Sequence, residues 1–247
     1  MRRERGLTLI ELAVVLIVLG ILLGIGAGIL GVLIKRIKFN ESREIVNANV
    51  EAVIGFAGQK GDLPSDSSEI AQAFKTFSDA YGKQLIYLFS DNLGNDICKE
   101  FGTKITLRIN CPDQTCSSYQ EINNVAFLII SGNGNYNLQT VDSSLIGTGI
   151  NQIPADLIAL EATGNITVKV YSYGVQVDDY TDDINRTEPY DDIVKWVTLY
   201  ELKEAINCPT VSVSITSPTY LPDAEEDSPY SYRLRAEGGY NNKWGVM

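Results

Sequence analysis

The sequence Gly6-Leu7-Thr8-Leu9-Ile10-Glu11-Leu12 begins a stretch in which Glu11 is the only charged residue before Lys35. Residues 12–34 are an uninterrupted run of apolar residues and glycine, and three arginines precede Gly6. As a helix the run would be about 35 Å long, against a hydrocarbon core of ~30 Å. The sequence therefore predicts a helix that crosses a membrane.

A cleaved secretory signal peptide and a plain membrane anchor are the alternatives for this run. A signal peptide has a shorter apolar core followed by a small-residue cleavage site, and the sequence has neither. A plain anchor leaves Glu11 unexplained, because an ionisable group in an apolar segment costs roughly 2.5 kcal/mol at mid-membrane and less near the end. We therefore expect Glu11 to have a specific partner.

The order of basic leader, glycine, Thr-Leu-Ile-Glu and apolar run resembles the class III signal of type IV pilins and type II secretion pseudopilins. The resemblance implies that a prepilin peptidase cleaves between Gly6 and Leu7 and that Leu7 is N-methylated, although the family usually has Phe at that position. It also implies that Glu11 neutralises the N-terminal amine of a neighbouring subunit in the filament. Opposite charges attract far more strongly in an apolar bundle than in water.

Charges on the two sides of the run give opposing signals for its orientation. The arginines of the leader favour a cytoplasmic N-terminus by the positive-inside rule. Lys35, Arg36 and Lys38 follow the run on its other side and act against that orientation. The resemblance implies a protein that crosses the inner membrane once, with its head in the periplasm or outside, and that later joins a cell-surface or periplasm-spanning filament.

The 247-residue chain has a formal charge of −11 and contains no histidine. Removal of the leader, with three arginines and one glutamate, takes away +2 and leaves −13 on the mature chain. An acidic surface argues against nucleic acid as the main partner, because phosphate binding needs clustered Lys and Arg. Without histidine, Ser-His-Asp and Cys-His catalysis and the usual zinc-hydrolase ligand sets are excluded. We therefore expect no enzyme, with hydrolysis by a carboxylate pair as the alternative.

Four cysteines, at positions 98, 111, 116 and 208, all follow the apolar run. An even number of cysteines in an exported domain predicts two disulfides, for which three pairings are possible. A zinc site is the alternative, but the sequence offers no Cys-x-x-Cys pair and no histidine. Cys98, Cys111, Cys116 and Cys208 are thus disulfide candidates.

Beyond Lys35 the pattern changes to that of an amphipathic helix, with apolar residues at steps of three and four up to Ala57. One helix is predicted from Leu7 to near Gly58. A short helix is expected within residues 63–81, and strands are expected over residues 83–89, 103–110, 124–131, 165–173 and 194–199. This order predicts an α+β fold. The resemblance implies the pilin fold, in which the long helix packs on an antiparallel sheet.

Two segments of the predicted sheet extend the resemblance. Residues 126–134 (AFLIISGNG) and 191–197 (DDIVKWV) are similar to late sheet strands of pseudopilins and large prepilins. The expected organisation is a cleaved leader over residues 1–6, the membrane and filament-core half of the helix over residues 7–34, the amphipathic half-helix and globular head over residues 35–208, and a β-rich extension over residues 209–247.

The extension shows alternating apolar and polar residues, which indicate β-strands. The stretch over residues 221–244 resembles the start of a bacterial Ig-like surface repeat. A complete sandwich needs about a hundred residues. The extension is therefore an incomplete module, an additional edge hairpin or a strand completed by another chain.

An acidic segment over residues 178–192 contains seven carboxylates. Such a cluster is either solvated or bridged by a cation, and calcium takes six to eight hard oxygen ligands. The spacing is not that of an EF-hand, but several pseudopilins hold calcium in this part of the domain. The candidate ligands for a structural Ca²⁺ are Asp178, Asp182, Asp183 and Asp192.

The resulting hypothesis is a structural subunit of a type IV pilus or a type II secretion pseudopilus. Its expected partners are identical or related pilin subunits in a helical filament, the prepilin peptidase and methylase, and an assembly platform in the inner membrane. The alternative is a minor or tip pilin that acts as an adhesin or a protein-binding module.

Overall fold

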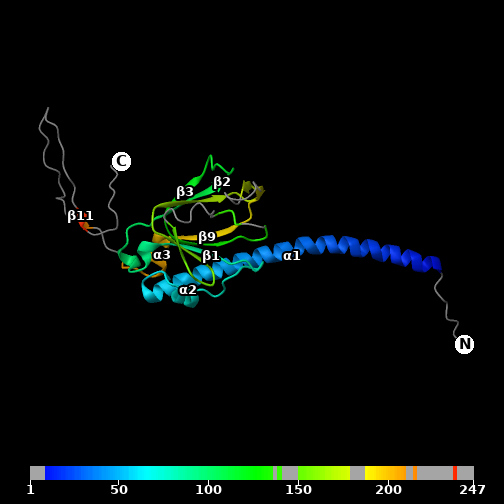
Figure 1. Ribbon diagram of the computed structural model, residues 1–247, viewed down its shortest axis with the longest axis horizontal. Helices are drawn as coiled ribbons and strands as arrows, with labels where there is room; N and C mark the ends of the chain where they lie inside the picture. The colour runs from blue at the N-terminus through cyan, green and yellow to red at the C-terminus, as the bar shows by residue number, and fades with distance from the viewer. Residues whose placement is uncertain are drawn as a thin grey trace, which may run out of the picture.

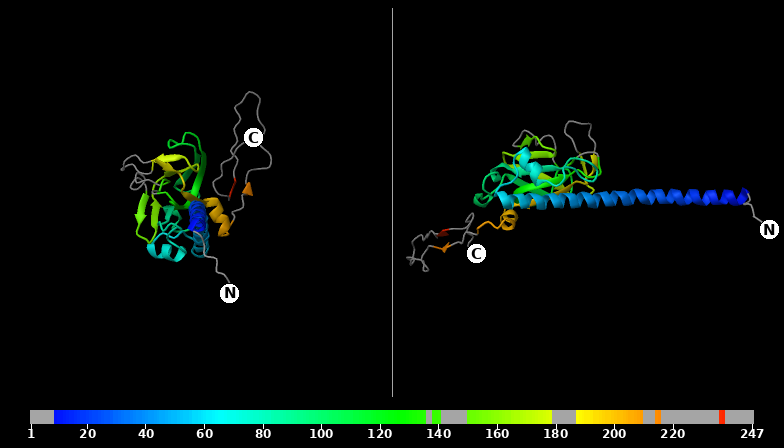
Figure 2. Two further views of the ribbon diagram at one scale, coloured as in Figure 1. Left: turned by 90° about the vertical axis from the view of Figure 1, so that its right-hand side faces the viewer. Right: turned by 90° about the horizontal axis from the view of Figure 1, so that it is seen from below.

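The computed structural model describes residues 9–135, 138–140, 150–178, 187–209, 214–215 and 236–237. Within these ranges it does not describe the side chains of residues 22, 23, 25–29, 178 and those of the two short segments after residue 209. A single long helix, α1 (Leu9–Lys60), carries a globular head on its C-terminal half, while its N-terminal half projects alone (Figures 1 and 2).

The two halves of α1 differ in what surrounds them. At 52 residues the helix is about 78 Å long. The described large apolar side chains from Leu9 to Ile37 are each about half exposed or more. Further along, one face is buried at steps of three and four, as the amphipathic pattern predicts: Ser42, Val46, Asn49, Val53 and Ala57. The prediction of one continuous helix with an amphipathic second half is confirmed.

Within the part of the chain that the structure describes, no helix meets the combined requirement of length and apolar character for crossing a membrane.

The C-terminus of α1 lies two residues beyond the predicted Gly58. The helix ends at Lys60, and the Gly61 N–H donates to the Ala57 carbonyl at 2.8 Å. Gly61 has φ of +83°, a left-handed conformation that glycine adopts without steric cost. The chain then turns back to α2 (Ser67–Ala73), where the Asp66 side chain accepts from the Ser68 and Glu69 amides and caps the helix.

The head contains a seven-stranded sheet whose strands form five lines. Along one side of β3 (Gln120–Ser131) lie β2 (Ile105–Cys111) and β1 (Ile86–Ser90), end to end, and on its other side lies β9 (Ile193–Thr198). Outside β1 and β2 lie β5 (Ile158–Ala162) and β6 (Ile166–Tyr171), again end to end. β4 (Ile150–Ile153) pairs with β5 at the edge. The five predicted strands are confirmed, whereas β4 and β5 were not predicted.

The expectation of an antiparallel sheet is wrong, because the sheet is mixed. β1 and β2 run in the same direction, since both are antiparallel to β3. The β4–β5 hairpin places β5 parallel to β1, and the chain continues from β5 into β6 without reversing, which makes β6 parallel to β2. Hydrophobic alternation sets which face of a strand is buried but not the direction of the strand.

Both faces of the sheet are buried, which explains the apolar run predicted for the central strand. Tyr87, Phe89 and Phe127 point to the face that packs against α1. The centre of the Tyr87 ring lies 5.0 Å from that of Phe89 and 6.0 Å from that of Phe127. Alternate residues such as Leu88 and Leu128 belong to a second buried cluster. One core therefore joins the helices to the sheet, and the other lies on the opposite face.

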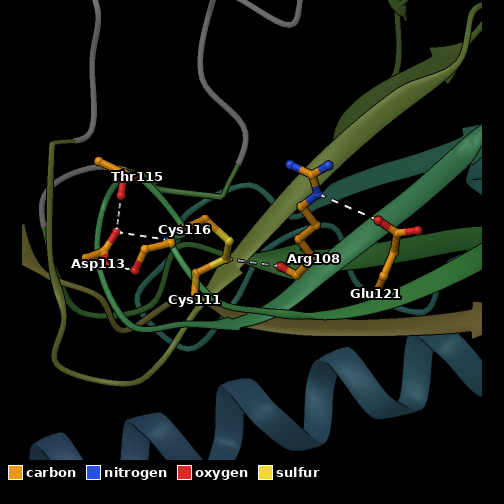
Figure 3. Close-up of a disulfide and its surroundings, with 7 residues drawn as sticks. Arg108, Cys111, Asp113, Thr115, Cys116 and Glu121 are labelled. Atoms are coloured by element: carbon orange, nitrogen blue, oxygen red, sulfur yellow. Dashed lines mark hydrogen bonds and ion pairs between the residues drawn. A yellow bond between two sulfur atoms is a disulfide. The ribbon is translucent and has the colours of Figure 1, made fainter.

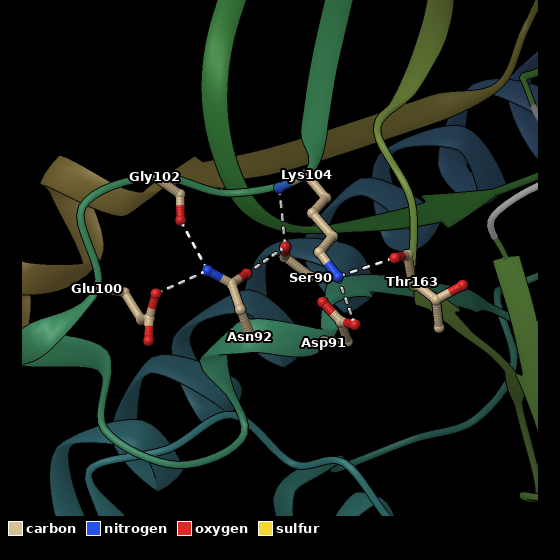
Figure 4. Close-up of polar contacts among 7 residues, drawn as sticks. All are labelled: Ser90, Asp91, Asn92, Glu100, Gly102, Lys104 and Thr163. Carbon is tan, nitrogen blue, oxygen red and sulfur yellow. Dashed lines mark hydrogen bonds and ion pairs between the residues drawn. The ribbon is translucent and has the colours of Figure 1, made fainter.

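A polar cluster occupies the break between the two end-to-end strand pairs (Figure 4). Lys104, just before β2, donates from its side chain to Asp91 at 2.7 Å and to the Thr163 carbonyl at 2.8 Å. Its amide donates to the Ser90 hydroxyl, and Asn92 donates to Glu100 and the Gly102 carbonyl. The short helices η1 (Asp91–Leu93) and η2 (Ile97–Lys99) form the connection between β1 and β2.

Two disulfides confirm the prediction from the cysteine count and settle the pairing. Cys98 is bonded to Cys208, 110 residues away, and Cys111 to Cys116 within the β2–β3 connection (Figure 3). The first joins η2 to the segment after α3 (Leu199–Ala205), and the Lys203 side chain on α3 donates to the Cys98 carbonyl at 3.1 Å. A cross-link that closes so long a loop stabilises a fold by about 4–5 kcal/mol in the chain-entropy account.

Two further pairs of short strands complete the described elements. β7 (Gln176–Asp178) and β8 (Thr187–Pro189) form a ribbon in the acidic segment. β10 (Ser214–Ile215) and β11 (Ala236–Glu237) are antiparallel, in agreement with strands in the extension. The remainder of residues 210–247 lies outside the described residues, and the division of the chain at residue 209 stays a prediction.

Asn49 links α1 to the connection between α2 and β1, which leads to the first testable prediction. Its buried side chain donates to the Thr76 carbonyl at 3.0 Å and accepts from the Lys75 amide at 2.9 Å. Asn49→Ala leaves these groups unpaired below the surface, and we expect a loss of about 3 kcal/mol. Urea unfolding of the detergent-solubilised chain measures this loss. Asn47→Ala, on the same helix, should cost less than a third as much, and equal losses would contradict the role of Asn49.

Candidate functional site

The residues expected to act in processing and assembly lie at the N-terminal end of the projecting helix. Gly6 and Leu7 are outside the described residues. Glu11 lies in the first described turn of α1, where the helix dipole favours a carboxylate. Its apolar neighbours are exposed: Leu9 retains 88% of its accessible surface and Ile10 retains 72%. Glu11 therefore lies on an exposed, largely apolar part of the helix.

The described side chains of the projecting half of α1 are mostly apolar and exposed. Its described leucines, isoleucines and valines face solvent along the whole length from Leu9 to Ile37. Contiguous apolar surface of this extent marks contact with a membrane or with other protein chains. The N-terminal half of α1 is therefore not part of the core of the head.

A second polar arrangement lies where β9 begins. The register pairs Ser131, at the end of β3, with Ile193, at the start of β9. The loop that follows β3 therefore lies next to Asp191 and Asp192. The side chain of Ser131 donates to Asp79 at 2.7 Å, which ties the same loop to the turn before β1.

Both carboxylates hold the loop after β3 through its backbone. Asp191 Oδ2 accepts from the amides of Gly134 and Asn135 at 3.1 and 3.2 Å. Asp192 Oδ2 accepts from the amides of Gln139 and Thr140 at 2.8 Å each and from the Thr140 hydroxyl at 2.7 Å. The loop is thus attached to the start of β9 by hydrogen bonds from its backbone amides to these two carboxylates.

Burial changes the acidity of both groups. Burial raises the pKa of Asp192 to about 7, although the hydrogen bonds from Thr140 and Gln139 favour the ionised form. The neighbouring Asp191 charge raises it further. The pKa of Asp191 is also raised, chiefly by burial, while its two amide donors and the nearby Lys83 act in the opposite direction.

The predicted calcium ligands are only partly described. Asp182 and Asp183 lie outside the described residues, and Asp178 is described by its backbone alone, in β7 opposite Thr187. Gln139 connects β7 to Asp192, because its side chain donates to the Val177 and Glu188 carbonyls. Among the described side chains, no group of three or more Asp, Glu, His or Cys residues is arranged to hold a metal ion.

Several oxygens around the carboxylate pair are buried without a hydrogen-bond partner in the described part of the chain. They belong to both carboxylates and to two amides of the loop after β3. They are Oδ1 of Asn133, Asn135, Asp191 and Asp192. Buried oxygens without a donor are unusual in folded proteins.

The loop after β3 contains functional contacts that were not predicted from the sequence. The combination of Asn133, Gly134 and Asn135 after a central strand was the available signal. A Cβ atom at Gly134 would lie 3.2 Å from the ring of Tyr81, closer than an ordinary contact. Tyr81 thus packs directly on the loop.

A cavity of about 730 Å³ lies between the loop after β3 and α1. Lys35, Arg36 and Phe39 line it from the helix, and Tyr81 and Tyr173 line it from the head. A second hollow of about 530 Å³ shares Phe39 and Tyr173 with it. Both hollows therefore lie beside the contact between Phe39 and Tyr173.

Comparison with known proteins identifies the N-terminal segment. Residues 1–27 match the family model described as the prokaryotic N-terminal methylation motif. This is the class III prepilin signal of type IV pilins and pseudopilins, and the resemblance of the N-terminal sequence is thereby confirmed. A search of curated proteins and a search of solved structures each found no match to the chain.

The raised pKa of Asp192 predicts how stability depends on pH. Folded Asp192 binds a proton up to pH about 7, whereas the unfolded side chain loses it near its usual value of 3.8. Asp192 therefore makes the free energy of unfolding fall as pH rises between these values. In Asp192→Asn this fall should become smaller, and in Asp156→Asn, which removes an exposed carboxylate, it should persist. Urea unfolding in EDTA from pH 4 to 8 measures both, and equal slopes in wild type and Asp192→Asn would refute the assignment.

Proposed function

We propose that the chain is a structural subunit of a type IV pilus or a type II secretion pseudopilus. The observation that supports this most directly is the methylation motif over residues 1–27, continued by a helix whose apolar side chains are exposed along its first half. Members with this motif are secreted pilin-type subunits rather than enzymes. The α+β head on a long N-terminal helix is consistent with a pilin-type architecture.

The proposed route begins in the inner membrane. A prepilin peptidase cleaves between Gly6 and Leu7, and the same maturation step methylates Leu7. The run over residues 12–34 holds the subunit in the membrane with its head in the periplasm or outside. An assembly platform then transfers the subunit into a filament, where the exposed half of α1 packs against the helices of other subunits.

Glu11 determines the axial position at which the subunit joins the filament. Once the helix leaves the lipid for a bundle of apolar helices, a lone carboxylate costs several kcal/mol unless a cation pairs with it. The new amine of Leu7 on a neighbouring subunit is such a cation. Charge pairing therefore favours one axial position of the incoming subunit over the others.

A minor or tip subunit that binds other proteins is the alternative. The acidic surface, the β7–β8 ribbon and the extension over residues 209–247 would then form the contact. Deletion of residues 210–247 separates the two proposals, because a tip adhesin loses binding while filament assembly persists.

We also propose a structural Ca²⁺ beside β9. It is supported by the buried, unpartnered oxygens of Asp191 and Asp192 and of the neighbouring asparagines, which are hard donors of the type that calcium prefers. Millimolar CaCl₂ should raise the midpoint of thermal unfolding by several degrees relative to EDTA. Asp192→Asn should remove the rise and Asp156→Asn should retain it. An unchanged midpoint in the wild type would exclude the site.

The assembly role of Glu11 can be separated from processing. Glu11→Gln removes the charge but keeps the size, and we expect the sheared filament fraction to fall at least tenfold. Mass spectrometry should still find an N-terminal peptide that starts at methylated Leu7. Glu41→Gln, an exposed acid on the same helix, is the matched control and should assemble normally. A native peptide that starts at Met1, or filaments of Glu11→Gln at the wild-type level, would contradict the proposal.

A further inference from the structure

Three cations follow directly on the exposed apolar part of α1. Lys35 and Arg36 are exposed, and the Lys38 ammonium lies 4.9 Å from the centre of the Tyr81 ring. Among the described residues, none of the three forms an ion pair with a carboxylate. Their charge is thus available at the surface of a chain whose overall charge is −11.

Aromatic residues from distant parts of the sequence surround these cations. The Tyr81 hydroxyl donates to the Lys35 carbonyl at 3.4 Å. Tyr173, in the turn after β6, contacts Phe39 of α1 edge to face at 6.4 Å, although 79% of its surface remains exposed. We call the set of Lys35, Arg36, Lys38, Phe39, Tyr81 and Tyr173 the junction rim.

The junction rim lies where the head ends and the bare helix begins. In Figure 1 the head covers the second half of α1 and stops near its middle, and residues 35–39 belong to this middle part of the helix. Lys35 and Arg36 line the 730 Å³ cavity together with Tyr81 and Tyr173. Among the described residues that line this cavity, Asp191 is the one carboxylate, and it accepts two hydrogen bonds from loop amides.

This combination of residues matches the chemistry of a lipid headgroup layer. Tyrosine side chains and snorkelling Lys and Arg concentrate at the boundary between hydrocarbon and water. Cations beside a membrane surface are attracted by anionic lipid headgroups. The cations also act against the positive-inside rule, and contact with headgroup phosphates is a physical reason for their presence there.

We propose that the junction rim binds the headgroups of anionic phospholipids and seats the head on the membrane before assembly. The proposal rests on the proposed function, because it requires residues 12–34 to lie in a bilayer. It adds a defined contact between the head and the lipid, made by Tyr81 and Tyr173 as well as by the helix. The unassembled subunit thereby has one preferred tilt relative to the bilayer.

Tyr173 and Tyr200 provide a matched pair of reporters. Tyr200 is 76% exposed, almost the same as Tyr173, but it lies on α3 at the opposite end of the head (Figure 1). The full chain is placed at one copy per nanodisc of phosphatidylcholine, with or without 30% phosphatidylglycerol, and oxidised by hydroxyl radicals. We expect phosphatidylglycerol to slow oxidation of Tyr173 at least threefold and to leave Tyr200 unchanged.

Charge variants test the basis of this protection. Lys35→Gln with Arg36→Gln should abolish the effect of phosphatidylglycerol on Tyr173. Lys60→Gln with Lys75→Gln makes the same change of charge at the far end of α1 and should retain it. Circular dichroism checks that both variants are folded. Protection that survives the loss of Lys35 and Arg36 would overturn the proposal.

The remaining outcomes distinguish the competing occupants. Equal oxidation of Tyr173 in both lipids, or protection by inorganic phosphate in detergent, would refute headgroup binding. Protection that appears only with two copies per nanodisc would assign the rim to a second subunit and would also refute it. A chain that does not enter nanodiscs of either composition would instead refute the membrane-anchored function, and with it the premise of the inference.

Discussion

Packing of one face of α1 against the sheet is the constraint on which the rest of the structure depends. The buried stripe from Ser42 to Ala57 fixes the head on the second half of the helix. Asn49 strengthens this attachment by satisfying backbone groups that the turn after α2 would otherwise bury unpaired. Because the helix is continuous, the position of the head also decides where the uncovered apolar surface ends.

The arrangement of the sheet places the carboxylate pair. β3 pairs with β1 and β2 on one side and with β9 on the other. The loop that follows Ser131 therefore begins beside Ile193, the first residue of β9. Asp191 and Asp192 occupy the last positions before β9 and bind that loop by accepting from its amides. A buried carboxyl group is costly unless it is neutral, hydrogen-bonded or paired with a cation. A bound proton and the proposed Ca²⁺ would each reduce the free-energy cost of burying the Asp192 carboxylate, so the two would compete for it.

Patterns of local origin were predictable from the sequence, and contacts between distant segments were not. The helix, its amphipathic half and five strands follow from periodicity, and the two disulfides follow from the number of cysteines in an exported chain. Strand direction and cysteine pairing depend on the path of the chain between elements, which alternation does not encode. The role of Asn133, Gly134 and Asn135 was missed for the same reason, because their partners Tyr81 and Asp191 lie more than fifty residues away in the sequence.

The methylation motif covers only residues 1–27, so it describes how the chain is processed but not how its head is used. The junction rim is where these two parts meet, since its cations belong to the helix and Tyr81 and Tyr173 belong to the head. A helix alone could rotate and tilt in a bilayer with little change in free energy. A head that contacts the headgroup layer through residues from three segments restricts both motions. The orientation in which Glu11 meets a neighbouring amine would then be set before the subunit leaves the membrane.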